Sequence, residues 1–442
     1  MRRILCLLLA LFYCLPIAAA EKYTEFPEAL RITNERVKTP VSDTSYKMFY
    51  YPVTCHDEVN AQLKERINQL AEKVAPVLPR KSAIKNESAM LDAGASIYRT
   101  GTSWASFLML ATVLDDQQQL AMAYDAWAYD LSTGSRLTLS DVLTESQAMW
   151  ETLREETYRQ LSAYYPQLMT GGSKISALCS PEHLLTIPFT LSPAFLQFHF
   201  PANALYEGRE MIMHVRIPYT LLAPYLTEAA KQQTDNSRYR LAALTFDDGP
   251  TRRRTLNVIR NLRSGCISAT FFIVGDRIAN APDLIALEHN AGHSIGSHNY
   301  HHVYPAEMRG KVQLYRDMLN AELIEITGQR VSLMRAPGGL EQIYIDENVG
   351  IPLIHWSLSS HDSSGESLEP STEARYLAYG VGDGGIILMH DLQASTSEYT
   401  YYMAAMLNNR GYMCVTVEEL FALRGIPLQP DTVYVKAPPA EQ

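Results

Sequence analysis

The second half of the sequence alternates short apolar runs with segments of helical periodicity, and this alternation restricts the folds that the chain can adopt. Helical stretches such as residues 255–263 and 311–327 separate the runs. The runs themselves are residues 240–246, 269–275, 331–337, 352–358 and 385–390. Repeated strand, helix, strand order predicts a parallel α/β architecture, in which functional groups gather at the carboxyl ends of the strands.

The first half predicts a mixed α+β region. A helix is expected after residue 58, and Pro76 would end it. Its apolar positions are Val59, Leu63, Ile67, Leu70 and Val74. Strand-like runs follow at residues 103–114, 120–131, 184–191, 195–200 and 211–219.

Residues 228–238 are polar and charged, without aromatic residues or periodicity, so we place a domain boundary there. A chain of 442 residues is too long for one core, which favours several domains. The expected parts are a signal peptide at 1–20, a front region at 21–235 that could divide into about 25–125 and 126–228, a second region at 239–425, and a C-terminal tail at 426–442.

The first twenty residues have the pattern of a secretory signal peptide. Arg2 and Arg3 precede an uncharged apolar run, and three alanines end at Ala20. We expect cleavage after Ala20 and a secreted or cell-wall-associated product. The alternative is an uncleaved membrane anchor, because the apolar run reaches the lower limit for spanning a bilayer.

Charge and cysteine usage narrow the possible partners. Lys and Arg number 38 against 48 Asp and Glu, which argues against nucleic acid and says little about a neutral glycan. Beyond the signal peptide the cysteines are Cys55, Cys179, Cys266 and Cys414. Disulfides within each half and four unpaired thiols are both compatible with this sequence.

The strongest local signal is Thr-Phe-Asp247-Asp248-Gly-Pro, which directly follows the apolar run that begins at residue 240. Two adjacent carboxylates alone are usually solvated turn residues. About fifty residues further, His298 and His302 stand four positions apart. A carboxylate with two imidazoles is a common ligand set for a catalytic divalent metal, because it leaves coordination positions open for water and substrate.

Three more segments follow in order. Arg335 begins Arg-Ala-Pro-Gly338-Gly, Trp356 begins a stretch that ends at Asp362, and Leu388 precedes Met-His390 at the end of an apolar run. Each segment alone is weak, because an arginine before proline can be a surface residue and a histidine after a strand can be a core residue. What indicates a functional site is that the segments occur together in this order.

Taken in this order, the segments resemble the five motifs of the polysaccharide deacetylases of carbohydrate esterase family 4, the NodB-homology domain. The resemblance covers about residues 240–424. It implies a distorted parallel (β/α) barrel with fewer than eight complete units, preceded by the α+β region.

The resemblance implies a metal site and a general base. Asp248, His298 and His302 would bind one divalent metal, zinc by default, although cobalt, nickel or iron fit the same ligands. Asp247 would be the general base, with Arg335 orienting it. Amide hydrolysis needs an activated water, a Lewis acid for the carbonyl oxygen and a proton for the leaving amine, so the set is chemically sufficient.

The remaining motifs imply an acid and a substrate surface. His390 would be the general acid, and Asp362 the carboxylate that pairs with it. Leu388 would line the pocket for the acetyl methyl group, and Trp356 belongs to the same substrate surface. The backbone N–H of Gly338 would help to hold the oxyanion, because glycine allows a close approach.

Some positions depart from the family pattern. Asn299 stands where Ser or Thr is usual, and Ser363 stands where many members have tryptophan, so an aromatic wall is expected to be absent there. Gly338 replaces the commoner tyrosine, as in a variant branch with R-x-P-G-G. His301 could be mistaken for a ligand, but only its neighbour His302 has the family spacing.

The front region resembles more loosely the amino-terminal region of certain Gram-positive cell-wall deacetylases, through residues 129–143 and 215–219. A related domain occurs in a membrane anti-sigma factor that binds lysozyme. The region could recognise the wall or could be a spacer. Its histidines show no ligand spacing and are not expected to be functional: His56, His183, His199 and His214.

The sequence therefore predicts an N-deacetylase of GlcNAc or MurNAc residues, with peptidoglycan as first substrate. Chitin-type oligosaccharides or O-acetyl xylan are alternatives that share the mechanism. A non-catalytic wall-binding or sensor protein is a third. A polysaccharide is the expected partner; nucleic acid is excluded, no protein partner is indicated, and a monomer is expected.

Overall fold

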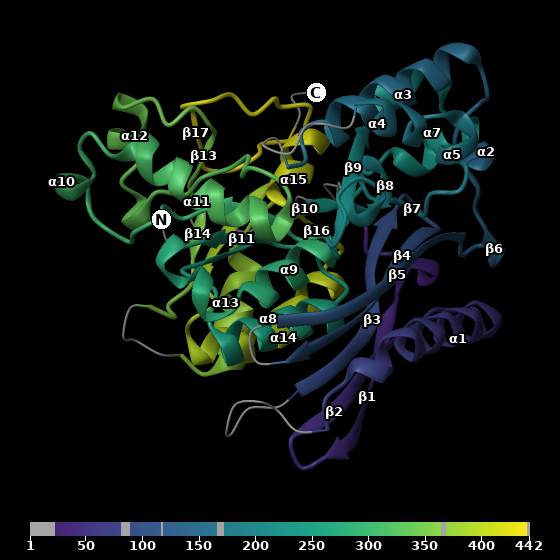
Figure 1. Ribbon diagram of the computed structural model, residues 1–442, viewed down its shortest axis with the longest axis horizontal. Coiled ribbons are helices and arrows are strands. Elements are labelled where there is room, and N and C mark those ends of the chain that lie inside the picture. Colours follow the sequence, from purple (N-terminus) through teal and green to yellow (C-terminus); the bar gives the residue numbers. More distant parts are fainter. Residues whose placement is uncertain (1–22, 81–88, 116–117, 166–171, 364–367, 440–442) are drawn as a thin grey trace, which may run out of the picture.

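The computed structural model describes residues 23–80, 89–115, 118–165, 172–363 and 368–439. They form a front region rich in antiparallel strands and a parallel α/β region that lies against it (Figure 1). The expected signal peptide lies outside these residues. Within the described part of the chain, no helix is both long and apolar enough to cross a membrane.

The front region is built on a six-stranded sheet in the order β1-β2-β3-β4-β5-β6. Neighbouring strands are antiparallel except β2 and β3, which run parallel because helix α1 (Asp57–Val74) connects them across the sheet. The strands are β1 (Thr33–Ser42), β2 (Ser45–Val53), β3 (Ala89–Thr100), β4 (Trp104–Asp115), β5 (Gln118–Asp130) and β6 (Ser135–Arg136). The runs at 103–114 and 120–131 are thus confirmed as strands.

Helix α1 confirms the apolar spacing read from the sequence. All five predicted positions, from Val59 to Val74, are buried and pack in the same cluster as residues of β3 and β4. Pro76 lies in the 3-10 turn Ala75–Val77, where the helix ends.

A second sheet consists of β7 (Phe189–Leu191), β8 (Phe195–Pro201) and β9 (Ile212–Pro218). The helices around it are α2 (Leu139–Val142), α3 (Gln147–Leu161), α4 (Gly172–Leu178), α5 (Pro181–Leu184), α6 (Tyr219–Leu222) and α7 (Glu228–Thr234). The strands expected at 195–200 and 211–219 are confirmed. The run at 184–191 is a strand only over β7, because its first residue ends α5, which Ser180 caps.

The segment expected to be a domain boundary contains helix α7 and packs against the front sheet. Gln233 Oε1 accepts a hydrogen bond from the backbone of Thr102 at 2.7 Å, and Asn236 Oδ1 accepts one from Gly101 at 2.9 Å. The suggested division between residues 125 and 126 falls inside β5, so it does not separate two structural units.

The second region confirms the parallel α/β class. Its strands run parallel in the order β12-β11-β10-β15-β14, and β16 also pairs with β10. They are β10 (Arg240–Asp247), β11 (Thr270–Ile273), β12 (Ser294–Ser297), β14 (Leu358–Ser359), β15 (Gly385–His390) and β16 (Tyr412–Val415). The helices are α8 (Arg252–Ser264), α9 (Pro282–Asn290), α10 (Pro305–Met308), α11 (Val312–Thr327), α12 (Gln342–Asp346), α13 (Pro370–Gly380), α14 (Ala394–Asn409) and α15 (Val417–Leu423).

The edges of this sheet approach each other. Met334 bridges Ser297 at the end of β12 to Leu353 of β13 (Leu353–Ile354), and residues 355–357 alone separate β13 from β14. So short a connection keeps the two edges close, as the expected distorted barrel requires. The run at 331–337 is not a strand; Met334 makes isolated bridges only.

The C-terminal residues belong to the second region rather than to a separate tail. Strand β17 (Val433–Tyr434) pairs with β13, and the backbone N–H of Ala437 donates to Gly384 at 2.9 Å. Ala437 is fully buried.

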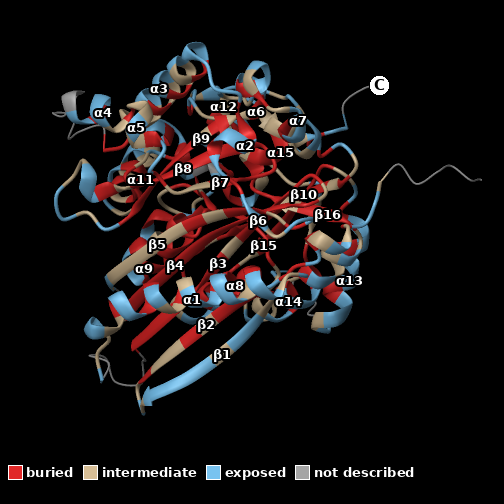
Figure 2. Ribbon diagram, turned by 90° about the vertical axis from the view of Figure 1, so that its right-hand side faces the viewer, coloured by how far each residue is buried: buried red, intermediate tan, exposed pale blue. Residues whose placement is uncertain are grey.

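The two regions share buried surface. One apolar cluster joins Leu108 and Leu110 of β4 to Leu284 and Leu287 of α9. Asp92 of β3 forms buried ion pairs with Arg260 and Arg263 of α8. At one edge of the front sheet, β1 is largely exposed (Figure 2).

The four described cysteines are free thiols. Cys179 and Cys266 are buried, Cys414 is half-buried and Cys55 is exposed. Of the two alternatives, the structure bears out unpaired thiols.

Candidate metal and catalytic site

The polar motifs converge at the carboxyl ends of the parallel strands. Asp247 ends β10 and is the register partner of His390, which ends β15. His298 directly follows β12. Because the strands are parallel, the residues that follow them meet at one end of the sheet.

Asp248, His298 and His302 form a group that could hold a metal ion, with one ligand atom of each within 4.8 Å of the others. Asp248 Oδ1 lies 3.6 Å from His298 Nε2 and 3.4 Å from His302 Nε2. This carboxylate oxygen is buried and has no hydrogen-bond partner in the described part of the chain. A buried oxygen facing two imidazole nitrogens is the environment that a divalent cation would satisfy, so these residues fit the expected metal.

Contacts with the backbone fix the orientation of two of the expected metal ligands, His298 and Asp248. His298 Nδ1 donates to the carbonyl of Arg335 at 2.9 Å, which leaves Nε2 with the free lone pair that a metal needs. Burial lowers the pKa of His298, which favours the same neutral form. Asp248 has φ of 74°, and Arg277 holds its carbonyl oxygen at 2.5 Å, so the aspartate is fixed in an unusual backbone conformation.

His301 points away from this group. Its Nδ1 lies 2.8 Å from Asp276 Oδ2, which agrees with the assignment of His302 as the ligand. Asn299, at φ of 68°, donates through Nδ2 to the carbonyl of His301 at 2.8 Å. The amide therefore braces the loop where the family pattern has a hydroxyl.

Asp247 is held by Arg335. Arg335 is completely buried and donates from one nitrogen to Asp247 Oδ1 at 2.8 Å and to Thr245 Oγ1 at 2.7 Å. It also donates to the carbonyl of Ile354 at 2.9 Å. The other oxygen of Asp247, Oδ2, lies 3.7 Å from His298 Nε2, so it faces the metal group.

Asp362 holds His390 in the same way. His390 donates to it twice at 2.8 Å, from Nδ1 to Oδ1 and from the backbone N–H to Oδ2. Burial acts to lower the pKa of His390, but the hydrogen bond and charge of Asp362, with the charges of Asp247 and Asp248, raise it to about 8. Nε2 then carries the proton that can be donated.

The expected substrate-binding residues lie at different parts of the site. Leu388 lies two positions before His390 on β15, so both side chains project from the same face of the strand. Trp356 stacks on His355 with ring centroids 3.9 Å apart and lies beside the Arg335 guanidinium. Gly338 has φ of 65°, which a glycine adopts without strain.

Gly339 and Tyr304 were not singled out by the sequence analysis. A Cβ on Gly339 would come within 2.7 Å of Trp356, so a second glycine is needed for close packing. Tyr304 is 58% exposed, lies next to Gly338 and has its ring 6.3 Å from that of His302. It supplies an aromatic surface beside the metal group, while Ser363 is exposed.

Further residues support the site, and no sequence motif identified them. Asp362 Oδ2 also accepts from Thr396 at 2.7 Å and from the Tyr399 hydroxyl at 2.9 Å. The buried Asp391 accepts a hydrogen bond from Thr255, and burial raises its pKa to about 7. A Cβ on Gly249 would overlap the carboxylate of Asp391, which explains the glycine in the first motif.

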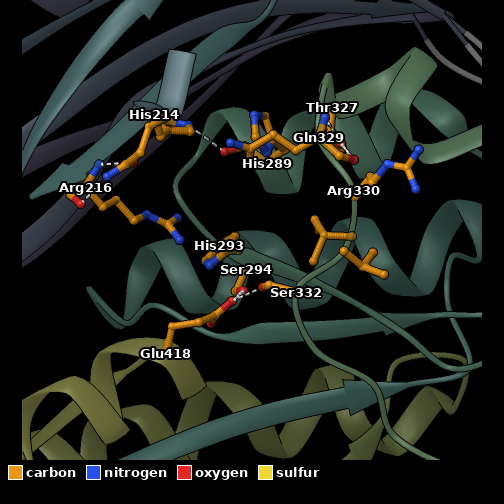
Figure 3. Close-up of a pocket in the computed structure, with 13 residues that line it drawn as sticks. His214, Arg216, His289, His293, Ser294, Thr327, Gln329, Arg330, Ser332 and Glu418 are labelled. Atoms are coloured by element: carbon orange, nitrogen blue, oxygen red, sulfur yellow. Dashed lines mark hydrogen bonds between the residues drawn. The ribbon is translucent and has the colours of Figure 1, made fainter. Parts of the chain in front are cut away.

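A separate polar cavity of about 160 Å³ lies where the front region meets the second region (Figure 3). Arg216 of β9 points into it, and Glu418 accepts hydrogen bonds from Ser294 and Ser332 on its opposite side. Ser294 begins β12, so this cavity lies at the opposite end of that strand from His298.

Two front-region histidines are structural residues, and one of them, His214, lines this cavity. The Nδ1 atoms of His199 and His214 lie 2.9 Å apart, and His214 Nε2 donates to the carbonyl of His289. Burial lowers the pKa of both, so they are neutral at pH 7. Both lie outside the metal group described above.

Comparison with known proteins agrees with this geometry. A family model described as polysaccharide deacetylase matches residues 234–349. The peptidoglycan-N-acetylglucosamine deacetylase PgdA of Listeria monocytogenes is 33% identical over 307 residues, which cover 66% of this chain and 63% of the Listeria protein. The chain therefore matches less than two thirds of that relative's length.

Two Bacillus proteins are also similar. A peptidoglycan-N-acetylglucosamine deacetylase of Bacillus cereus is 30% identical over 194 residues, covering 41% of this chain and 88% of that protein. The peptidoglycan-N-acetylmuramic acid deacetylase PdaC of Bacillus subtilis is 26% identical over 316 residues, covering 66% and 67% of the two chains.

Proposed function

The chain belongs to the polysaccharide deacetylase family, and from that premise we propose that it hydrolyses N-acetyl groups of a cell-wall polysaccharide and releases acetate. The preferred substrate is peptidoglycan, acting at its GlcNAc or MurNAc residues. The names of the Listeria and Bacillus relatives support this choice.

One observation supports the proposal above all others: two proton carriers, each held in place by a charged partner, stand at neighbouring strand ends beside the metal group. Asp247 is held by Arg335, and His390 is held by Asp362. Asp247 and His390 are register partners, so they reach a common space. A non-catalytic sensor would not need both carriers, which makes that alternative the weaker one.

Each step of amide hydrolysis can be assigned to particular residues. A divalent cation at Asp248, His298 and His302 would polarise the acetyl carbonyl and make a water molecule more acidic. Asp247 accepts the proton of the attacking water, since Arg335 occupies only its Oδ1 and leaves Oδ2 facing the cation site.

His390 completes the reaction. It donates its Nε2 proton to the sugar nitrogen as the carbon–nitrogen bond breaks, and the remaining hydrogen bond to Asp362 keeps the ring in place. The backbone N–H of Gly338 stabilises the oxyanion, and Leu388 packs against the acetyl methyl group. Trp356 and Tyr304 contact the sugar rings.

Zinc is the cation that we propose, because two imidazoles and one carboxylate with open positions suit it. Cobalt, nickel and iron suit the same ligands. Export follows the signal-peptide pattern at residues 1–20 and would bring the enzyme to a wall polymer. The protein acts as a monomer in this proposal.

The same chemistry could act on chitin-type oligosaccharides or on O-acetyl xylan. A bifunctional xylanase/deacetylase of Pseudobutyrivibrio xylanivorans, 28% identical over 228 residues, is the observation that favours the second of these. Acetate release from peptidoglycan, chitooligosaccharides and acetylated xylan, measured side by side, ranks the three.

Metal removal tests the proposal. We expect a chelator to abolish acetate release by the mature protein, and added zinc to restore it. His302→Ala should lose both bound metal and activity, whereas His301→Ala, one position away, should retain both because His301 faces Asp276. Full activity of the metal-free protein would overturn the proposal.

Asp247→Asn separates chemistry from binding. Loss of a general base lowers turnover by about 10²- to 10⁴-fold. The metal content, measured by elemental analysis, should be unchanged because Asp248, His298 and His302 remain. Undiminished turnover would remove Asp247 from the role of base.

A further inference from the structure

A groove runs between the exposed edge strand β1 and helices α8 and α14, and none of the metal-binding or catalytic residues described above lines it. Two adjoining hollows of about 650 and 550 Å³ form it, and they share Arg36, Asn261 and Tyr401. Each is as large as a typical small-molecule site of about 300–1,000 Å³. Figure 2 shows β1 alongside α8 and α14 on this face.

Two tyrosines project into the groove from α14. Tyr401 is 54% exposed and Tyr402 is 47% exposed, and their rings lie edge to face at 5.6 Å. Tyr399, two positions earlier, is buried against Asp362, so α14 has one structural face and one aromatic face directed outward. Exposed tyrosines offer a flat apolar ring and a polar hydroxyl together, which suits partly polar ligands.

Side-chain amides supply the polar lining. Asn261 donates through Nδ2 to the carbonyl of Ser397, and Asn408 donates to that of Gly265 at 2.7 Å. Asn34 donates to the carbonyl of Arg263 at 2.8 Å, while its Oδ1 is buried without a partner among the described residues. With their donors anchored, the half-buried Asn261 and Asn408 present oxygen acceptors at fixed positions, whereas the buried oxygen of Asn34 is closed to a ligand.

The charges along the groove are mixed. Arg31 pairs with Glu25 at 3.2 Å at one end. Arg36 lines the middle, and Glu369 and Glu398 line the other end. A surface with both signs interspersed attracts neither a polyanion nor a polycation, which favours a neutral ligand.

We propose that this groove binds a neutral polysaccharide strand as a second contact site, with sugar rings stacked on Tyr401 and Tyr402 and hydroxyls donated to the asparagine oxygens. Sugar rings have apolar C–H faces and many hydroxyl donors, so they complement both parts of this lining. The inference rests on the proposed function in its choice of ligand, since the catalytic site would then act on the same polymer.

A residue that lines the groove is adjacent, along α14, to a residue that supports the catalytic site. Ser397 lines the groove, and the preceding residue, Thr396, donates to Asp362 at 2.7 Å. A polymer held along α14 would therefore lie near the residues that orient His390. Such a contact retains the polymer between turnovers and matters only for substrates long enough to reach both places.

The test compares long and short ligands in the full mature chain. In the double variant Tyr401→Ala/Tyr402→Ala we expect binding to insoluble chitin, an uncharged N-acetylated polysaccharide, to weaken about tenfold, because two aromatic contacts are lost. The KM on the polymer should rise by a similar factor. The kcat/KM on N,N′-diacetylchitobiose should be unchanged, since the tyrosines lie outside the catalytic site.

Controls separate this inference from the proposed function. Tyr158→Ala removes an exposed tyrosine from α3, outside the groove, and should leave binding unchanged. Tyr401→Trp/Tyr402→Trp should retain it, because stacking needs a ring face. Binding is measured without turnover in an Asp247→Asn background, so an inactive enzyme still reports on the groove. Unchanged retention of the alanine variant, or preferential binding of an anionic polymer at these tyrosines, would overturn the inference.

Discussion

The carboxylate of Asp362 sets the charge state that we expect for His390. Burial alone would lower the pKa of this imidazole, yet the hydrogen bond at 2.8 Å and the nearby negative charge raise it to about 8. A histidine with that pKa is mostly protonated at pH 7, as a general acid must be. Thr396 and Tyr399 keep the carboxylate in place.

As the pH is raised, the Asp362→Asn variant should therefore lose activity at a lower pH than the parent. A neutral amide stabilises the imidazolium less, so the pKa of His390 falls below 8. Activity that needs the protonated ring disappears as the pH rises through that pKa, and the alkaline limb of kcat/KM moves to lower pH. NMR titration of the His390 ring measures the same shift directly.

Asp276→Asn is the matched control, because it removes a carboxylate 2.8 Å from His301 rather than from His390. Its alkaline limb should stay at the parental pH. An unmoved limb in Asp362→Asn would mean that another group controls the alkaline pH dependence.

The sequence could predict which residues converge, because each motif follows an apolar run and parallel strands bring such residues to one end of a sheet. It could not select Tyr399, which reaches Asp362 only through the packing of α14. The role of Asp391 was equally hidden, since its contact with Gly249 joins residues that are distant in the chain. Contacts of this kind produce no periodic pattern in the sequence, so they cannot be predicted from it.

At the scale of elements, the short strand β13 positions Arg335. Arg335 donates to the carbonyls of Ile354, at 2.9 Å, and His355. The same backbone is fixed from the other side by residues near the C-terminus: His355 N–H donates to the carbonyl of Tyr434 at 2.8 Å. The chain end thus supports the residue that orients Asp247.

Deleting residues 432–442 should lower both stability and turnover. The deletion removes β17, so β13 loses its pairing partner and Arg335 loses the fixed carbonyls that hold it. We expect a lower Tm by thermal unfolding and a reduced kcat on N,N′-diacetylchitobiose with metal content retained. A chain that ends at Ala437 keeps β17 and the contact with Gly384, and should behave as the parent. Equal turnover of both truncations would contradict this role.

Elements of regular length were predictable and very short ones were not. Helix α1 has four turns of apolar spacing, and the runs that form β4 and β10 are long enough to read as strands. Strands β13 and β17 contain two residues each, too few for any alternation. The C-terminal segment was therefore expected to be a tail.

At the scale of the whole molecule, the polar boundary read at residues 228–238 does not separate two independent bodies. The regions share an apolar cluster, and Asp92 of the front sheet lies buried between Arg260 and Arg263 of the second region. Removing residues 21–235 would expose that cluster and leave two buried cations unpaired. The front region thus has a structural role whatever else it binds.

Asp92→Ala tests this union with a single substitution. Asp92 is 1% exposed, and its removal leaves Arg260 and Arg263 without their carboxylate in a buried place. Breaking a buried ion pair from one side costs about 3–5 kcal/mol of unfolding free energy. Urea unfolding measures it, with metal content showing whether the second region is affected.

Asp125→Ala supplies the comparison within the front region alone. Asp125 pairs with Arg66 at 2.8 Å, but both side chains are partly exposed, so its loss should cost about 1 kcal/mol or less. If the two variants lost equal amounts of unfolding free energy, the ion pairs between the regions would contribute no more to stability than the partly exposed pair of Asp125. If the regions fold as one unit, Asp92→Ala should lose more stability than Asp125→Ala, and both regions should unfold in one transition. The reason is that the stability of each region then depends on the surface that it buries against the other.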